Sequence, residues 1–578
     1  MKKRLLILLV AAMTLLMSFA TFAEGEMEKK GILVVSFGTS YMDTYTKTIK
    51  ATEDAIAKAY PEYEVREAFT SSIIRNKIMK RDGVEKLSPE EALMRMKEEG
   101  FSEVIVQPLH VITGIEYEEV VDVVNKFNDG SFKKLELGKP LLFNIDEEEG
   151  TNDYLDVVMA LKPMLSMYKD TAVVYMGHGT HHPANASYEV LERTFKDAGM
   201  NNVFVGTVEG YPGLDEVMAE VQEAGYEKVV LLPFMIVAGD HASNDMAGDE
   251  EDSWKTGFKM EGFEVEPKLI GLGEIASIQN IYIQNVEKAI EGEGVELKEK
   301  EAKYIPESYS PIEGKKALLV VSFGTSYKDT RDLTIEAIEK RIEKVLPWYD
   351  VKRAFTSDMI IRNIEKKENV KVNNVDEAFM ELIKEGYEEV VVQPTHIMPG
   401  HEYTDLVNTF DKYKDVFKTA KIGQPALYHI DLEGNENHYK EVVKALKPQL
   451  EGFDDKAVVF MGHGSTHSAN STYALLQRVM NDEGIDNVFV GTVEGYPTLN
   501  DVITMVKEKG HDKVVLMPFM IVAGDHASND MAGDEEDSWK TAFKAEGFEV
   551  EVYLHGLGEN KDFQKIYIER IYNTLRAE

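Results

Sequence analysis

The sequence predicts an α/β protein in which one bilobal module, made of two doubly wound parallel-sheet lobes, occurs twice in tandem. Long stretches recur almost unchanged: Val34–Tyr41 returns as Val320–Tyr327, and Lys228–Thr256 returns as Lys513–Thr541 with one difference. Within each copy, short β-branched runs alternate with amphipathic stretches, which is typical of parallel sheets covered by helices. We therefore predict modules at 29–290 and 314–578, joined by a polar linker at 291–313.

Local patterns predict the elements of the first module in order. Apolar, β-branched runs predict buried parallel strands at Ile32–Ser36, Val104–Gln107, Ala172–Met176, Val203–Thr207 and Val229–Leu232. Helical periodicity predicts helices at Thr44–Ala59, Pro89–Glu99, Asn185–Ala198 and Leu214–Ala224. A weaker internal likeness, LVVSFGTS to VVYMGHGT, divides the module into two lobes with a cleft between them. Ligands of such sheets bind at the carboxyl ends of the strands, and the distinctive loops all fall there.

The N-terminus differs from the rest of the chain. Basic residues at Lys2–Arg4 precede an apolar run, Leu5–Phe19, and small residues lead to Glu24. This pattern predicts a cleaved secretory signal at 1–23 and an exported protein, periplasmic or extracellular. The alternative is an uncleaved anchor, but the run is shorter than the ~20 residues that a membrane span needs. We expect no stable membrane span after cleavage.

Composition excludes several classes of function. The 578 residues include no cysteine, which excludes disulfides, thiolate zinc sites and thiol nucleophiles. A net charge of -38 argues against nucleic acid as a partner, because a polyanion rewards the opposite sign. The chain has neither a phosphate loop nor a GxGxxG fingerprint, so we expect no nucleotide cofactor.

Three loops at strand ends carry the residues best suited to chemistry. MGHGTHH contains His178, GTVEGYP contains Glu209 and AGDHASNDMAGDEEDSW contains His241. About 30 residues, the length of a βα unit, separate them, so they can meet at successive strand tips. Two imidazoles and one carboxylate suit a divalent ion such as Co²⁺, Ni²⁺, Fe²⁺ or Zn²⁺ and leave positions open for exchange. Ordinary hydrogen-bonded histidines are the alternative. The second module repeats the set as His463, Glu494 and His526.

Four further residues are candidates for contacts to a bound molecule. The SFGTS turns carry Ser36 and Ser322 and resemble anion-binding turns before a helix, without the lysine of a phosphate loop. His110 and His396 each follow a Gln-Pro pair at a strand end, which makes them candidates to line the cleft. The acidic segment Gly248–Trp254 is either a solvated helix start or a patch that gathers cations.

Taken together, SFGTSY, QPLHVITG, MGHGTHH, GTVEGYP and PFMIVAGDHASNDMAGDEEDSW resemble the anaerobic-type sirohydrochlorin cobaltochelatases, which are class II tetrapyrrole chelatases. The resemblance covers both modules. It implies a chelatase-like bilobal fold and an enzyme of cobalamin biosynthesis that inserts Co²⁺ into a sirohydrochlorin-type tetrapyrrole without ATP. It also implies that the family's metal-binding His, Glu and His fall on His178, Glu209 and His241, and on their counterparts in the second module.

Chemical roles follow as hypotheses. We expect His178, and His463 in the second module, to act also as general base, because imidazole titrates near neutrality. Glu209 and Glu494 would ligate the metal during catalysis. The tandem arrangement and the signal depart from the family pattern and leave two alternatives open. One is an exported tetrapyrrole, haem or metal binder that serves uptake; the other is removal of metal from a scavenged porphyrin. Self-association of the modules is open as well.

Overall fold

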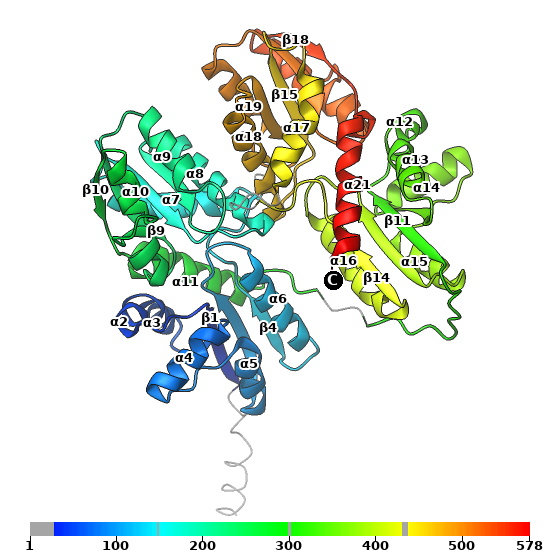
Figure 1. The fold of residues 1–578 in the computed structure, drawn as a ribbon. Helices are drawn as coiled ribbons and strands as arrows, with labels where there is room; N and C mark the ends of the chain where they lie inside the picture. The colour runs from blue at the N-terminus through cyan, green and yellow to red at the C-terminus, as the bar shows by residue number, and fades with distance from the viewer. Residues whose placement is uncertain (1–27, 147–148, 299–301, 431–436, 578) are drawn as a thin grey trace, which may run out of the picture.

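Parallel β-sheets organise the computed structural model, which describes residues 28–146, 149–298, 302–430 and 437–577 (Figure 1). Within these residues lie four parallel sheets of four strands, two in each module, and one short antiparallel pair. Helices separate successive strands in every sheet. The predicted α/β class with paired parallel-sheet lobes in tandem is confirmed. The predicted signal at 1–23 lies outside the described residues.

The first lobe places its most apolar strand inside the sheet. β1 (Lys29–Ser36) lies between β2 (Glu64–Phe69) and β3 (Phe101–Pro108), and β4 (Lys134–Leu137) forms the edge beyond β3. Residues 32–35 of β1 are at most 1% exposed, as expected for a strand covered on both faces. The helices of this lobe are α2 (Met42–Lys47), α3 (Ile49–Ala59), α4 (Ser72–Asp82), α5 (Pro89–Glu98) and α6 (Ile115–Phe127).

One helix prediction in this lobe is wrong. A single helix was expected over Thr44–Ala59, but the chain leaves helical geometry at Thr48, with φ -116° and ψ -84°. The Thr48 hydroxyl donates to the Thr44 carbonyl at 2.6 Å, which satisfies a backbone group locally. Thr48 also packs so closely on Gly273 that a side-chain carbon there would lie 2.9 Å from the threonine. A tertiary contact therefore overrides helical periodicity at this position.

The second lobe has the same layout. β7 (Ala172–Gly177) lies between β8 (Val203–Thr207) and β9 (Lys228–Phe234), and β10 (Glu264–Pro267) is the edge strand beyond β9. The short antiparallel pair consists of β5 (Ile145–Asp146) and β6 (Thr151–Asn152). The helical segments are α7 (Asp153–Leu165), η1 (Pro183–Ala186), α8 (Ser187–Asp197), α9 (Leu214–Glu223), η2 (Ala242–Met246), α10 (Trp254–Met260) and η3 (Leu272–Glu274).

The last helix of the module, α11 (Ala276–Glu291), returns to the first lobe. It contacts α3, β3 and β4. Tyr60 at the end of α3 donates its hydroxyl to the Ile283 carbonyl at 2.9 Å, and Tyr282 shares an apolar core with Ile56 of α3. Because this helix belongs in sequence to the second lobe, it fastens the two lobes together.

The second module repeats this plan. Its first sheet has the order β12-β11-β13-β14 and its second has the order β16-β15-β17-β18. The strands are β11 (Lys316–Ser322), β12 (Asp350–Phe355), β13 (Glu389–Pro394), β14 (Thr419–Ile422), β15 (Ala457–Gly462), β16 (Val488–Thr492), β17 (Lys513–Pro518) and β18 (Glu549–Val552). The helical segments are α12 (Lys328–Leu333), α13 (Ile335–Val345), α14 (Asp358–Glu368), α15 (Val375–Lys384), α16 (His401–Tyr413), η4 (Lys414–Val416), α17 (His438–Leu450), η5 (Ser468–Ser471), α18 (Thr472–Asp482), α19 (Leu499–Glu508), η6 (Ala527–Met531), α20 (Trp539–Ala545), η7 (Leu557–Glu559) and α21 (Lys561–Arg576).

The modules meet through their second lobes. Helix α8 faces α18 (Figure 1), and η1 lies against η5, so equivalent elements of the two copies face each other. We call the surface formed by these four elements and the residues bonded across it the module seam. Thr113 bonds Ser468 at 3.0 Å, and the Asn144 amide donates to the Thr466 carbonyl at 3.1 Å.

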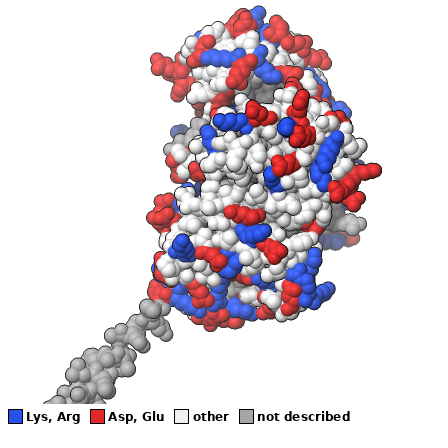
Figure 2. Space-filling view, turned by 90° about the vertical axis from the view of Figure 1, so that its left-hand side faces the viewer, with Lys and Arg blue, Asp and Glu red and all other residues white. Residues whose placement is uncertain are grey.

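Charges of both signs are mixed over the surface. Figure 2 shows acidic and basic side chains interspersed on the face drawn, with apolar and neutral residues between them. In the described part of the chain, every helix is too short or too polar to cross a membrane.

Candidate metal centre

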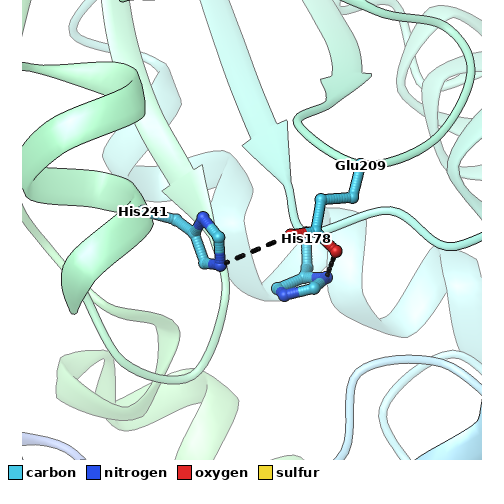
Figure 3. Close-up of side chains that lie close together, drawn as sticks. All are labelled: His178, Glu209 and His241. Atoms are coloured by element: carbon cyan, nitrogen blue, oxygen red, sulfur yellow. Dashed lines mark ion pairs between the residues drawn. The ribbon is translucent and has the colours of Figure 1, made fainter. Parts of the chain in front are cut away.

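Three neighbouring strands deliver the predicted ligands of the first module to one place. His178 follows directly after β7, Glu209 lies two residues beyond β8, and His241 precedes η2 in the loop after β9. Since β7 lies between β8 and β9 in the sheet, their carboxyl ends open onto the same edge. Figure 3 shows the three side chains pointing toward one another from these loops.

The distances suit a metal ion that would draw the ligands together. His178 Nδ1 lies 3.8 Å from Glu209 Oε2, and His241 Nε2 lies 4.0 Å from Glu209 Oε1. The two imidazole rings are 4.7 Å apart between centroids and nearly perpendicular, at 85°. One ligand atom from each residue lies within 4.8 Å of the others. Zinc-type ions hold nitrogen and oxygen ligands at roughly 2.0–2.2 Å, so small side-chain rotations bring all three onto one ion.

The second module reproduces this geometry. His463 Nδ1 lies 3.6 Å from Glu494 Oε2, and the rings of His463 and His526 are 4.7 Å apart at 83°. One possible ligand atom from each of His463, Glu494 and His526 lies within 4.8 Å of the other two. Both modules therefore bring the predicted His-Glu-His set together.

The ligands remain accessible to solvent. The side chains of His178, Glu209 and His241 are 45%, 57% and 34% exposed. An ion held here keeps one side free, because three protein ligands do not complete the usual coordination shell of a divalent transition metal. The site can thus receive an ion and pass it to a second ligand.

Glycine makes the close approach of the ligand loops possible. Gly179 has φ +79°, and a side-chain carbon there would lie 2.5 Å from the Gly210 nitrogen. The Glu209 amide donates to the His178 carbonyl at 2.7 Å, which ties the two ligand loops together. Gly464 repeats this conformation in the second module, with φ +85°. Any other residue would push the loops apart.

An aspartate orients the third ligand, and sequence reasoning missed it. His241 Nδ1 lies 2.6 Å from Asp245 Oδ2, and His526 Nδ1 lies 2.7 Å from Asp530 Oδ2. A hydrogen bond from Nδ1–H to the carboxylate leaves the lone pair of Nε2 free for a metal, which is the usual arrangement around metal-binding histidines. The i,i+4 spacing of His and Asp in AGDHASNDMAG was the signal that could have revealed this pair.

A loop of the first lobe reaches the metal centre. The Tyr41 hydroxyl donates to Asp240 Oδ1 at 2.7 Å, next to His241, and Tyr327 makes the same bond to Asp525 at 2.9 Å. In the second module the Phe323 ring lies 6.4 Å from the His463 ring. The SFGTSY loops thus contact the loop that carries the third ligand. The sequence flagged the motif but not these partners.

The remaining predicted site residues lie outside the triads. His110 and His396 follow β3 and β13, and both ring nitrogens of each are buried without a hydrogen-bond partner in the described structure. Burial lowers the pKa of each imidazole to about 4, so both are neutral at physiological pH. The Ser36 hydroxyl is also buried without a partner in this part of the chain, whereas Ser322 bonds Thr395 at 2.7 Å.

The acidic segment beyond the triad is solvated. Asp249 to Asp252 are exposed, and Asp249 pairs with Lys255 at 2.7 Å. Ser253 then caps α10 by accepting a bond from the Thr256 amide. This placement fits a solvated helix start, and the segment is close in sequence to the third ligand.

Comparison with known proteins places this geometry in a family. The family model described as "Cobalt chelatase (CbiK)" matches residues 30–291 and matches again at residues 316–576. The chain belongs to this family. A CbiK unit therefore occurs twice in one polypeptide, and membership makes the chain a chelatase-type enzyme, a lyase.

Two curated relatives of this chain have about the length of a single module. A sirohydrochlorin cobaltochelatase from Salmonella typhimurium is 38% identical over 262 residues, which is 45% of this chain and 97% of that protein. The sirohydrochlorin cobaltochelatase CbiKC from Nitratidesulfovibrio vulgaris is 35% identical over 271 residues, which is 46% of this chain and 92% of the relative. The solved structure of SirB from Bacillus subtilis with Fe³⁺ aligns with a TM-score of 0.34 at 18% identity, over 46% of this chain and 98% of that chain.

Proposed function

We propose that this CbiK-family chain inserts Co²⁺ into sirohydrochlorin or a closely related tetrapyrrole, once in each module and without a nucleotide. The observation that carries the proposal is the pair of His-Glu-His sets, each with ligand atoms within 4.8 Å of one another. The names of the two relatives supply the metal and the macrocycle. Fe²⁺, Ni²⁺ and Zn²⁺ suit the same ligand types, so the ligand set alone does not select cobalt.

The reaction exchanges two protons for one ion. Two pyrrole N–H bonds break, the ion sheds water, and four metal–nitrogen bonds form as two protons leave. His178 Nδ1 lies 2.9 Å from the Gly179 carbonyl, so a bond to this carbonyl leaves the Nε2 lone pair free for the ion or for a pyrrole proton. Glu209, between the two histidines and 57% exposed, can neutralise the ion and pass protons to solvent.

The decisive experiment removes one ligand from each centre. The double variant H178A/H463A should lose insertion of Co²⁺ into sirohydrochlorin by at least ~100-fold, because each centre keeps only two ligands. The conversion of the macrocycle is followed by its visible absorption. His555→Ala is the matched control, since this exposed histidine belongs to neither His-Glu-His set and contacts Glu559 and the Tyr553 ring, both close to it in sequence. Near-normal turnover in the double variant would contradict the assignment of the His-Glu-His sets as the sites of metal insertion.

The N-terminal sequence favours a second candidate function. An exported location, which the basic and apolar start of the chain supports, also suits a haem or metal carrier for uptake, or an enzyme that removes metal from a scavenged porphyrin. Incubation of the mature protein with haem separates these functions. A stable haem spectrum without turnover indicates carriage, and release of free macrocycle indicates metal removal. N-terminal sequencing of the exported form should begin near Glu24; a retained Met1 would contradict cleavage.

A further inference from the structure

We infer that each metal centre is positioned by the opposite module, through a tyrosine that crosses the module seam from the loop carrying the glutamate ligand. The inference rests on the proposed function of these centres. It assigns positioning roles to Tyr211 and Tyr496 and to the aspartates that receive their hydroxyls.

The seam tyrosine and the glutamate ligand belong to one loop, which the Asn185 side chain holds. Tyr211 lies two residues after Glu209, and the Asn185 amide donates to the Tyr211 carbonyl at 2.5 Å. The Asn185 side-chain oxygen accepts a hydrogen bond from the Thr180 backbone N–H at 3.1 Å. One side chain therefore joins the loop of Glu209 to the loop of His178. A displacement of Tyr211 is therefore carried by the backbone to two metal ligands. Asn470 makes the same pair of bonds in the second module.

Each tyrosine ends on the opposite module. Tyr211 is only 4% exposed, and its hydroxyl donates to Asp482 Oδ2 at the end of α18. Tyr496 is 8% exposed and donates in the reverse direction, to Asp197 Oδ2 at the end of α8, at 3.0 Å. The two bonds are reciprocal, because each tyrosine donates its hydroxyl to an aspartate of the opposite module.

An arginine of the opposite module covers each ring. The Arg478 guanidinium lies 6.0 Å from the Tyr211 centroid, and the Arg193 guanidinium lies 5.3 Å from the Tyr496 centroid. Such contacts restrict the rings further. Both copies keep the tyrosine, the aspartate and the arginine, although α8 and α18 differ at intervening positions, where Glu189 corresponds to Ala474.

The glutamate ligand depends on this support. The Glu209 carboxylate lies 3.8 and 4.0 Å from the two histidines, distances too long for hydrogen bonds. Its position is therefore set by the loop backbone, which Tyr211 anchors at the seam. A ligand held slightly out of place weakens metal binding before it affects folding.

The test uses the full chain with one centre removed at a time. H463A/H526A leaves the first centre as the only His-Glu-His set, and H178A/H241A leaves the second. D482N or D197N is added to each parent, and affinity for Co²⁺ alone is measured from its visible absorption. In the parent that retains the first centre, D482N should weaken Co²⁺ binding about three- to tenfold, the size expected for the loss of one ordinary hydrogen bond. In the parent that retains the second centre, D482N should leave the Co²⁺ affinity unchanged. D197N should weaken Co²⁺ binding in the parent that retains the second centre and leave it unchanged in the parent that retains the first.

Two further variants separate positioning from general damage. Y211F removes only the hydroxyl and should reproduce D482N, while D486N, at an exposed aspartate of the same module, should leave both centres unchanged. Circular dichroism verifies that the variants are folded. An effect of D482N confined to the second centre, an equal effect on both centres, or no effect on either would overturn the inference. The proposed function can fail independently of this inference. It fails if each aspartate variant weakens Co²⁺ binding only at the centre of the opposite module, as expected, but the unmodified protein does not insert Co²⁺ into sirohydrochlorin.

Discussion

The two His-Glu-His sets have kept one geometry, whereas the seam between the modules has become asymmetric. The imidazole rings are 4.7 Å apart in both centres, at 85° and 83°. At the seam, carboxylates of the first module correspond to uncharged residues of the second: Glu189, Glu192 and Glu220 against Ala474, Gln477 and Met505. After duplication, the two His-Glu-His sets kept the same spacing while the seam acquired two complementary sides.

Arg478 carries most of this asymmetry. Its side chain is 6% exposed and lies 3.1 Å from Glu189 and 3.9 Å from Glu192 of the first module, with Glu220 also bonded to it. The corresponding Arg193 is half-buried and lies over the Tyr496 ring. The same residue type is thus buried among opposite charges on one side of the seam only.

The largest predicted effect is on the free energy of unfolding, when each of the two arginines is replaced in turn. Arg478→Met should cost on the order of 3–5 kcal/mol, because it removes the buried cation that Glu189, Glu192 and Glu220 share. Arg193→Met should cost about 1 kcal/mol or less, the size of a partly exposed contact between a cation and a ring. Thermal unfolding of the two variants measures the difference. Equal losses would show that the seam is energetically symmetric.

A smaller difference lies between α3 and β2 in the first module and between α13 and β12 in the second. Glu53 faces a second carboxylate, Glu67, whereas the equivalent Glu339 faces Arg353, whose Nε donates to it at 2.7 Å. Burial, together with the charge of Glu67, raises the pKa of Glu53 to about 8. One copy therefore buries a glutamate that is neutral over much of the physiological range, and the other buries an ion pair.

Substitution by glutamine should change the free energy of unfolding by about 1–3 kcal/mol in opposite directions at the two sites, the size of the penalty for a buried group without its partner. The unfolded chain ionises Glu53 near pH 4.5 and the folded chain near pH 8, so the unfolded state binds fewer protons in between and stability falls as pH rises across that window. Glu53→Gln should therefore have little effect at pH 5 and stabilise the protein at pH 9. Glu339→Gln should destabilise at neutral pH, because Arg353 loses its partner. Unfolding midpoints from pH 5 to 9 test both, and a stabilising E339Q would contradict the scheme.

The smallest predicted effect concerns the equivalence of the centres. H178A and H463A, made singly, should each retain about half of the insertion rate, because the intact centre continues to turn over; a factor of two corresponds to only about 0.4 kcal/mol. Initial rates at saturating Co²⁺ and macrocycle measure this. Loss of nearly all activity in one single variant would show that the modules are unequal despite their shared geometry.

Much of the fold was predictable because buried strands carry their own signature. The apolar runs at Ile32–Ser36 and Ala172–Met176 are the interior strands β1 and β7. The edge strands β2, β4 and β10 were not predicted, because charged residues alternate along them, as in EVREAF, KLEL and EVEP. Half-exposed edges lack a continuous apolar run, so the pattern that reveals a central strand is missing there.

The candidate site was predictable where strand order alone decides it. His178, Glu209 and His241 lie at tips of adjacent strands, and repeat spacing was enough to bring them together. The bonds from Tyr41 to Asp240 and from Tyr211 to Asp482 join residues far apart in sequence. Such pairs depend on how lobes and modules pack, which periodicity and spacing do not encode.

The return of α11 to the first lobe bears on the order in which the chain is made. Synthesis delivers β1 to β4 long before α11, yet Ile56 of α3 shares its core with Tyr282 of that helix. The nascent first lobe consequently presents an uncovered apolar face until residue 291 has emerged. This face is completed only after a whole module has been made, and α21, which contacts α13, has the same late position in the second module.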